Sequence, residues 1–304
     1  DWSSDVCSSD LVSLYPSAFI RLGGFLRGAP KILKTTCYNR IKKLDGYFVE
    51  INIKKKNNKS NRKYLHFPLL NKINDEGIRH YSNNISGKIY VDKTTLEDLI
   101  NFHKLKPNID FDIIRGYYFN QGRNTTINEV MKTLFNNRIK KKKDKNPVQE
   151  IYKLIMNSAY GKTITKPYET DNKFVYGEDE KDRFLQYNCM SIRSFTEIYN
   201  DQNIIKKDDN DDIIKMKKLN KKYIFKMINT INEHFSMPHI GAEILSMSKR
   251  IMCEVMCLAQ DLNIEIFYTD TDSMHIREKD IKILAEQFKL KYDRDLIGDR
   301  KSVV

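Results

Sequence analysis

The sequence predicts an α/β protein, with an antiparallel sheet that carries paired carboxylates and a two-helix hairpin beside it. Three observations support this fold class. The first is an acidic turn between two short apolar runs, and the second is a pair of consecutive helices that meet at a basic loop. The third is a methionine-rich helix that is apolar on more than one face.

The acidic turn lies within residues 264–276, where Asp270 and Asp272 stand between apolar runs. This pattern predicts two short strands joined by a polar turn. Because Asp270 and Asp272 are two residues apart, extended chain directs both side chains to one face of the sheet. Two carboxylates on a hairpin suit Mg²⁺, which prefers one or two carboxylates together with substrate phosphates. A solvated turn is the alternative, since Asp and Thr are common in turns.

Two helices are predicted over residues 126–143 and 146–161. Thr126–Glu129 has the pattern of a capping box, and Asn146–Gln149 combines a cap residue, a proline at the first helical position and a glutamine that closes a second box. The short interval between the helices predicts an antiparallel hairpin. Its tip contains Arg138–Lys143, so we expect a basic end that suits a triphosphate, with a solvated basic face as the alternative.

One face of the second helix carries three polar side chains with distinct chemistry. Lys153, Asn157 and Tyr160 are spaced at i, i+4 and i+7, so they lie on the same side of a helix. Together they offer a cation for a phosphate, an amide, and a ring on which a base or sugar can stack.

Residues 241–262 are predicted to form a buried helix, because their apolar side chains cover more than one face. Residues 46–53 and 113–119 are predicted to be strands, and residues 91–100 a strand that passes into a helix. Residues 206–212 are charged and have no apolar period, and we expect an irregular, charged stretch around them between residues 163 and 238.

Three motifs, taken in chain order, carry a family resemblance. They are D-x-x-S-L-Y-P-S from Asp10, K-x-x-x-N-S-x-Y-G-K from Lys153 and Y-x-D-T-D-S from Tyr268. Their order and spacing resemble those of the family B DNA polymerases, in the protein-primed branch of phages, linear plasmids, adenoviruses and self-synthesising transposons. The resemblance implies a polymerase palm with an antiparallel sheet, a two-helix fingers hairpin and inserted regions that contact a terminal priming protein.

The resemblance also implies a role for each matching residue. Asp10, Asp270, Asp272 and the Leu11 carbonyl would hold two Mg²⁺ ions, or Mn²⁺ in their place, and Lys153 would assist catalysis at the triphosphate. The incoming nucleotide would contact Leu11, Ser13, Leu14, Tyr15, Arg138, Lys141, Lys142, Asn157 and Tyr160, with the Tyr15 ring excluding a 2′-hydroxyl. Primer and template would contact Ser158, Gly161 and Thr269.

The same resemblance divides the chain. We expect palm at 12–25, an inserted terminal-protein-contact region at 26–120, fingers at 121–164, a second insertion at 165–235, palm at 236–280 and palm towards the thumb at 281–298. Residues 1–11 and 299–304 look like translated sequencing adapter. Asp10, which matches the metal-ligand position of the first motif, lies within that stretch. We expect a fragment without the family's proofreading nuclease and most of its thumb. Sequencing an intact clone across both ends would test this.

Composition favours a polyanionic partner. The chain has 53 basic against 40 acidic residues, a formal net charge of +13, which suits primer–template DNA and deoxynucleoside triphosphates. No apolar run is long enough to span a membrane. Five cysteines without CxxC spacing favour a reducing, intracellular compartment, and we expect Cys253 and Cys257 to be core thiols rather than zinc ligands. We expect a monomer.

Two other functions fit parts of the sequence. A glycosyltransferase also uses an Asp-x-Asp metal site, but it leaves the Lys153, Asn157 and Tyr160 face and the run from Ser13 to Pro16 without a purpose. A nucleic-acid-binding remnant that holds primer–template without extending it would keep the same motifs.

Overall fold

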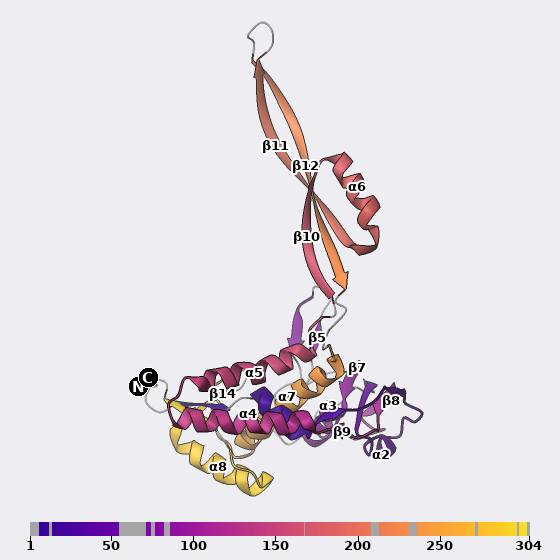
Figure 1. Ribbon diagram of the computed structural model, residues 1–304. Coiled ribbons are helices and arrows are strands. Elements are labelled where there is room, and N and C mark those ends of the chain that lie inside the picture. The colour runs from indigo at the N-terminus through magenta and orange to yellow at the C-terminus, as the bar shows by residue number, and fades with distance from the viewer. Residues whose placement is uncertain are drawn as a thin grey trace. The chain divides into compact units, whose positions relative to one another are not determined.

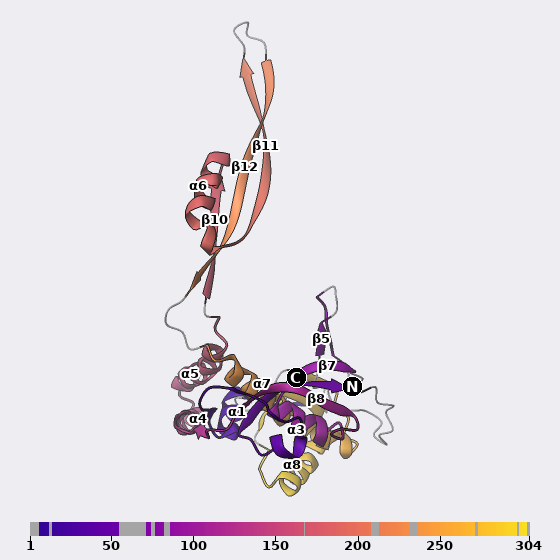
Figure 2. The same cartoon turned by 90° about the vertical axis from the view of Figure 1, so that its right-hand side faces the viewer.

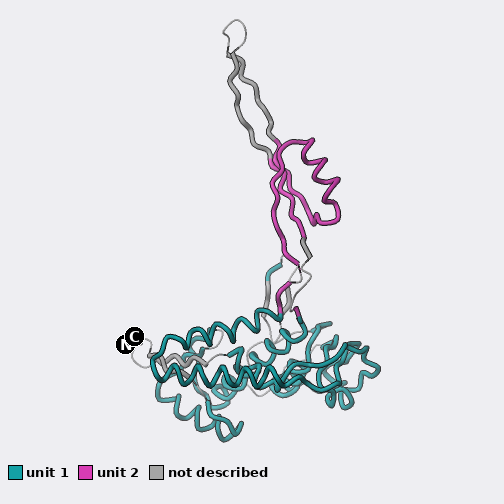
Figure 3. Tube along the Cα trace, viewed as in Figure 1, with its two compact units in different colours: residues 1–163, 237–304 teal, residues 164–236 magenta. Residues whose placement is uncertain are grey.

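The computed structural model describes residues 6–11, 14–54, 71–73, 77–81, 86–166, 168–207, 213–230, 236–270, 273–296 and 298–302. The chain divides into two compact units (Figure 3). Unit 1 comprises residues 1–163 and 237–304, and unit 2 comprises residues 164–236. Antiparallel sheets combine with helices in both units, so the predicted α/β class is confirmed.

The first sheet of unit 1, here called the carboxylate sheet, has the strand order β13-β14-β1-β15, and Figure 1 labels its strand β14. Every strand pair in it is antiparallel. Its strands are β1 (Val6–Leu11), β13 (Tyr268–Asp270), β14 (Ser273–Arg277) and β15 (Gly298–Ser302). The predicted acidic hairpin is therefore present as β13 and β14.

Helix α7 (Pro238–Asp261) is the predicted methionine-rich helix, and it begins with Pro238 in its first turn, where a missing N–H costs no hydrogen bond. It contributes to three core clusters. Cys253 and Cys257 enter the first, Met252 and Val255 are among those in the second, and Ile240, Ile244 and Met247 enter the third. This distribution explains why the helix is apolar on more than one face, as predicted.

Helix α1 (Leu14–Leu22) follows the first strand of the carboxylate sheet. β1 ends at Leu11, and Pro16 lies in the first turn of α1. Proline is tolerated there because the first N–H groups of a helix have no partner within it. Ala18 and Phe19 bury the inner face of α1 against α7.

Helices α4 (Thr126–Lys143) and α5 (Val148–Thr163) form the predicted hairpin (Figure 1). Asn146 caps α5 as expected, since its Oδ1 accepts a hydrogen bond from the Val148 N–H at 2.9 Å. Neither capping box is present. Gln149 donates to Glu150 at 2.5 Å instead of reaching back, and the cap residue of α4 is Thr125, without a side-chain cap bond. Gln149 instead bonds its neighbour in the chain, and the Thr126 N–H donates to the Asn124 side chain two residues earlier.

The second sheet of unit 1 has the order β3-β8-β4-β7. Its strands are β3 (Lys31–Ile32), β4 (Gly46–Ile53), β7 (Gly87–Asp92) and β8 (Phe111–Phe119), and helices α2 (Tyr38–Ile41) and α3 (Lys93–Asn101) accompany it. The predicted strands at 46–53 and 113–119 are confirmed. So is the passage at 91–100, where Asp92 caps α3 by accepting from the Thr95 N–H at 3.1 Å.

Two short pairs and one helix complete unit 1. These are β2 (Phe25–Leu26) with β9 (Arg123–Asn124), β5 (Asn71–Ile73) with β6 (Arg79–Tyr81), and α8 (Glu278–Tyr292). Leu284 and Phe288 of α8 join Met274 and Ile276 of β14 in the second core cluster. Figure 2 shows β5 and α8 from a second side.

Unit 2 is built on a three-stranded antiparallel sheet with the order β10-β12-β11. Its elements are β10 (Tyr168–Tyr176), α6 (Glu178–Asn188), the 3-10 turn Cys189–Ser191, β11 (Ile192–Lys207) and β12 (Ile213–Thr230). The expectation of an irregular charged stretch here is wrong. Alternate residues of β12, namely Tyr223, Phe225 and Met227, form a core with Val175, and the neighbouring Lys222 and Lys226 hide this period of two. Residues 208–212 lie outside the described part of the chain.

The prediction that Cys253 and Cys257 are core thiols is confirmed. Cys253 and Cys257 are buried thiols in the core, whereas Cys37 and Cys189 are exposed and unpaired with each other. In the described ranges, no helix is both long and apolar enough to cross a bilayer.

Candidate active site

The strand register brings the first and third motifs to one level of the carboxylate sheet. Asp10 of β1 is opposite Ser273 of β14, and Asp270 of β13 is opposite the same Ser273 from the other side. Asp10 and Asp270, which are 260 positions apart in the sequence, therefore flank one residue of the central strand. Their Cα atoms are separated by two strand spacings, roughly 10 Å.

The local environment differs between the two flanking positions. Asp270 is exposed and Ser273 is buried, while Thr269 is half-buried and opposite Met274. Leu11 is the last residue of β1. Ser13 and Asp272 lie outside the described residues. Within the described side chains, no three carboxylate, histidine or cysteine groups gather closely enough to hold a metal ion. That set excludes the side chains of Asp10 and Asp272.

The first and second motifs meet through two aromatic rings. Tyr15 of α1 and Tyr160 of α5 stack with ring centroids 4.5 Å apart and planes within 6° of parallel. Burial, and secondarily the neighbouring Tyr15, raises the pKa of Tyr160. Ala18 and Phe19 of α1 and Met156 of α5 belong to one core cluster, and Tyr15 and Tyr160 pack against it. The core therefore supports the stacked rings.

The predicted polar face of α5 is present and open. Lys153 and Asn157 are exposed, and Tyr160 is half-buried by its stack on Tyr15. The Lys153 Nζ lies 4.0 Å from the Glu150 carboxylate across one helical turn, a weak exposed pair that leaves the ammonium accessible. Ser158 and Gly161 are exposed on the same helix.

The basic end of the helical hairpin is not uniform. Lys141 is half-buried and Lys142 exposed, but Arg138 is only 7% exposed. Its Nε and Nη1 atoms have no hydrogen-bond partner within the described residues. Lys140–Lys143 form the last turn of α4, where cations oppose the negative end of the helix dipole. Lys141 and Lys142 thus stand closer to solvent than Arg138.

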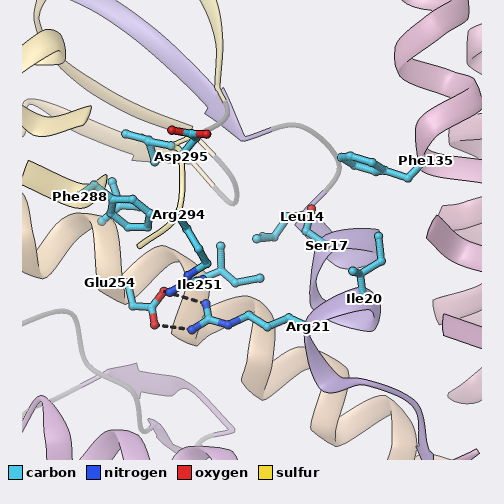
Figure 4. A pocket seen from close by; sticks show the side chains of 12 residues that line it. Leu14, Ser17, Ile20, Arg21, Phe135, Ile251, Glu254, Phe288, Arg294 and Asp295 are labelled. Atoms are coloured by element: carbon cyan, nitrogen blue, oxygen red, sulfur yellow. Dashed lines mark hydrogen bonds and ion pairs between the residues drawn. The ribbon is translucent and has the colours of Figure 1, made fainter. Parts of the chain in front are cut away.

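An ion cluster beneath α1 has no signal in the sequence. Arg21 of α1 donates two hydrogen bonds to Glu254 of α7, at 2.7 and 2.5 Å. Arg294, beyond α8, donates a third at 3.0 Å. Figure 4 shows the Arg21–Glu254 pair at the wall of a cavity of about 390 Å³. The cluster ties the helix that carries Tyr15 to the central helix of unit 1.

Replacing Glu254 with glutamine is expected to lower the free energy of unfolding by about 2 kcal/mol, because two arginines then lose a buried counter-charge. Urea denaturation would measure the change. The control is Glu265→Gln, since Glu265 pairs with Arg277 at 2.8 Å on an exposed surface and should change stability by less than about 0.5 kcal/mol. Equal effects of the two substitutions would contradict a structural role for the cluster.

Comparison with known proteins agrees with the motifs. Residues 3–240 match the family model described as DNA polymerase type B, organellar and viral. A DNA polymerase of Acidianus bottle-shaped virus (isolate Italy/Pozzuoli) is 41% identical over 63 residues, which cover 20% of this chain and 9% of that protein.

Solved structures of Phi29 DNA polymerase are also similar to this chain. The complex with primer-template DNA and incoming nucleotide has a TM-score of 0.49 at 14% identity, covering 90% of this chain and 39% of that one. The binary complex with primer-template DNA has a TM-score of 0.47 at 15% identity, with 90% and 38% covered. This chain thus spans about two-fifths of the Phi29 polymerase length. The family match extends over more than three-quarters of this chain, and the resemblance drawn from three motifs is confirmed: the chain belongs to the type B DNA polymerases of organelles and viruses.

Proposed function

We propose that the chain is the polymerising part of a protein-primed DNA polymerase. It adds deoxynucleoside monophosphates from dNTPs to a primer 3′-hydroxyl, or to a hydroxyl of a priming protein, during replication of a virus, plasmid or transposon. The observation that carries the proposal is the register that sets Asp10 and Asp270 on either side of Ser273. Acidic residues of two motifs separated by most of the sequence thereby reach one level of one sheet.

The proposed donor set fits hard divalent cations. Asp10, Asp270, Asp272 and the Leu11 carbonyl offer only oxygen ligands, which Mg²⁺ and Mn²⁺ prefer. Bound there, such ions would lower the pKa of the attacking hydroxyl and stabilise the leaving pyrophosphate.

The side chains around the sheet would bind and orient the nucleotide. Lys153 is exposed on α5 and would pair with the triphosphate and donate a proton towards the leaving group. Asn157 and Tyr160 would position the base and sugar, and Tyr15 would fill the space that a 2′-hydroxyl needs. The remaining proposed nucleotide contacts are Leu11, Ser13, Leu14, Arg138, Lys141 and Lys142, and those to primer or template are Ser158, Gly161 and Thr269.

The inserted regions would serve the partners. The sheet β3-β8-β4-β7 buries Tyr47, Val49 and Ile51 on one face. Tyr90 and Tyr117, which are 73% and 55% exposed, offer a surface to which a priming protein would bind. The long hairpin of unit 2 would contact DNA. We propose that the protein acts as a monomer in an intracellular, reducing compartment.

Primer extension tests the proposal directly. The purified chain, given a primed template, Mg²⁺ and four dNTPs, is expected to extend the primer, and Lys153→Gln should lower kcat/KM for dNTP by on the order of 10- to 100-fold, the loss of one charge-assisted contact. Lys132→Gln, an exposed lysine on α4, is the control and should leave the value unchanged. Retained DNA binding without extension by the parent chain would instead identify a binding remnant.

A further inference from the structure

A strongly basic segment lies between α1 and β4, away from the three motifs in the sequence. Residues 27–43 contain six cationic residues and no carboxylate. These are Arg27, Lys31, Lys34, Arg40, Lys42 and Lys43. Since the whole chain has a net charge of +13, six of these thirteen excess charges are concentrated in 17 residues. General solvation of the protein does not require so uneven a distribution.

All six cationic side chains are exposed, and none takes part in an ion pair with the described residues. Six other arginines of unit 1 differ from these, because each pairs with a carboxylate: Arg21, Arg115, Arg123, Arg250, Arg277 and Arg294. The nearest acid along the chain, Asp45, is engaged by the Gly122 N–H at 2.7 Å. The positive charge of the segment is therefore not neutralised locally.

The backbone of the segment is anchored to the second sheet. β3 pairs with β8 at the sheet edge, with Lys31 opposite Tyr118, and the Leu33 N–H donates to the Gly116 carbonyl at 2.8 Å. Ile41 of α2 is completely buried, and Leu33 packs against the same core cluster. Apolar side chains thus fix the segment while its cations face outwards, which makes a defined surface.

We propose that this surface, residues 27–43, binds the phosphate backbone of a nucleic acid. The cations are spread along an edge strand and the turn of helix after it, rather than converging on a point. That spacing suits a repeating polyanion better than one small anion. The choice of nucleic acid over an acidic protein rests on the proposed function, which brings DNA to this chain. The surface would hold nucleic acid without reading its sequence, because phosphate contacts carry none.

The salt dependence of binding tests the proposal. The Kd of the chain for a 20-bp duplex and for a 20-nucleotide single strand would be measured by fluorescence anisotropy over a range of salt concentrations, without dNTPs. The double variant Lys31→Gln, Lys34→Gln should reduce the slope of log K against log salt by about 1.8 for duplex, or about 1.4 for a single strand. At 0.1 M salt the affinity should fall by on the order of 10-fold.

The matched control is Lys279→Gln, Lys282→Gln, which removes the same charge from exposed positions on α8. It should leave the slope unchanged. Equal effects of the two variants would reduce the finding to overall charge and overturn the proposal. So would an unchanged slope in the first variant or a parent chain that does not bind nucleic acid. Primer extension is a separate readout, so a chain that fails to extend but shows the specific slope change refutes only the proposed function.

Discussion

Replacing Asp272 with asparagine is expected to abolish primer extension, with a loss of kcat on the order of 10³-fold or about 4 kcal/mol. The substitution keeps the size of the side chain but removes the charge that would hold a divalent cation. Asp270→Asn should have a smaller effect, because we assign Asp270 as the third carboxylate beside Asp10 and Asp272. Single-turnover extension at saturating dNTP and Mg²⁺ would measure both variants.

Two comparisons make this result specific. Asp179→Asn removes an exposed carboxylate from α6 in unit 2 and should leave extension unchanged. DNA affinity measured for Asp272→Asn in the absence of metal should equal that of the parent, which separates a catalytic defect from unfolding. Extension that survives the Asp272 substitution would refute the assigned metal role.

Tyr15→Val is expected to relax discrimination against ribonucleotides by on the order of 10²-fold, the scale that one steric contact supplies. Tyr15 is held by its stack on Tyr160 at 4.5 Å, so its ring is fixed at the junction of α1 and α5. Valine removes the ring and opens the space where a 2′-hydroxyl would lie. The measurement is the ratio of kcat/KM for dNTP to that for the matching rNTP.

Tyr15→Phe provides the control, because it keeps the ring and loses only the hydroxyl. We expect its discrimination ratio to stay within a few-fold of the parent. A ratio unchanged in Tyr15→Val, or lost equally in Tyr15→Phe, would show that ring volume does not exclude the ribose. Thermal unfolding of both variants would identify any loss of the packing between α1 and α5.

The features predicted correctly from the sequence are those fixed by local chemistry. The hairpin around Asp270 followed from alternating apolar runs at a polar turn. The start of α5 followed from Asn146 as cap residue. Helix α7 was expected to be buried because its apolar residues surround the axis, and it does enter three core clusters.

The features that could not be predicted depend on distant or competing partners. Arg21 and Glu254 are 233 positions apart, so no local pattern indicates that they meet. In β12 the inward-facing Tyr223 and Phe225 lie between Lys222 and Lys226, and the high charge concealed the strand. Neither expected capping box formed: the Gln149 amide nitrogen donates to Glu150, and the cap residue of α4 is Thr125 rather than Thr126, alternatives that spacing alone does not decide.

Helix α7 contributes side chains to three core clusters of unit 1. A packing defect on one side of this helix therefore also weakens the packing on its other sides, because one backbone carries all of these side chains. We therefore expect unit 1 to unfold cooperatively. The carboxylate sheet, the helical hairpin and the second sheet should lose their packing when α7 unfolds. Unit 2 has a core of its own, formed by Val175, Tyr223, Phe225 and Met227. Its unfolding therefore does not depend on the packing of α7.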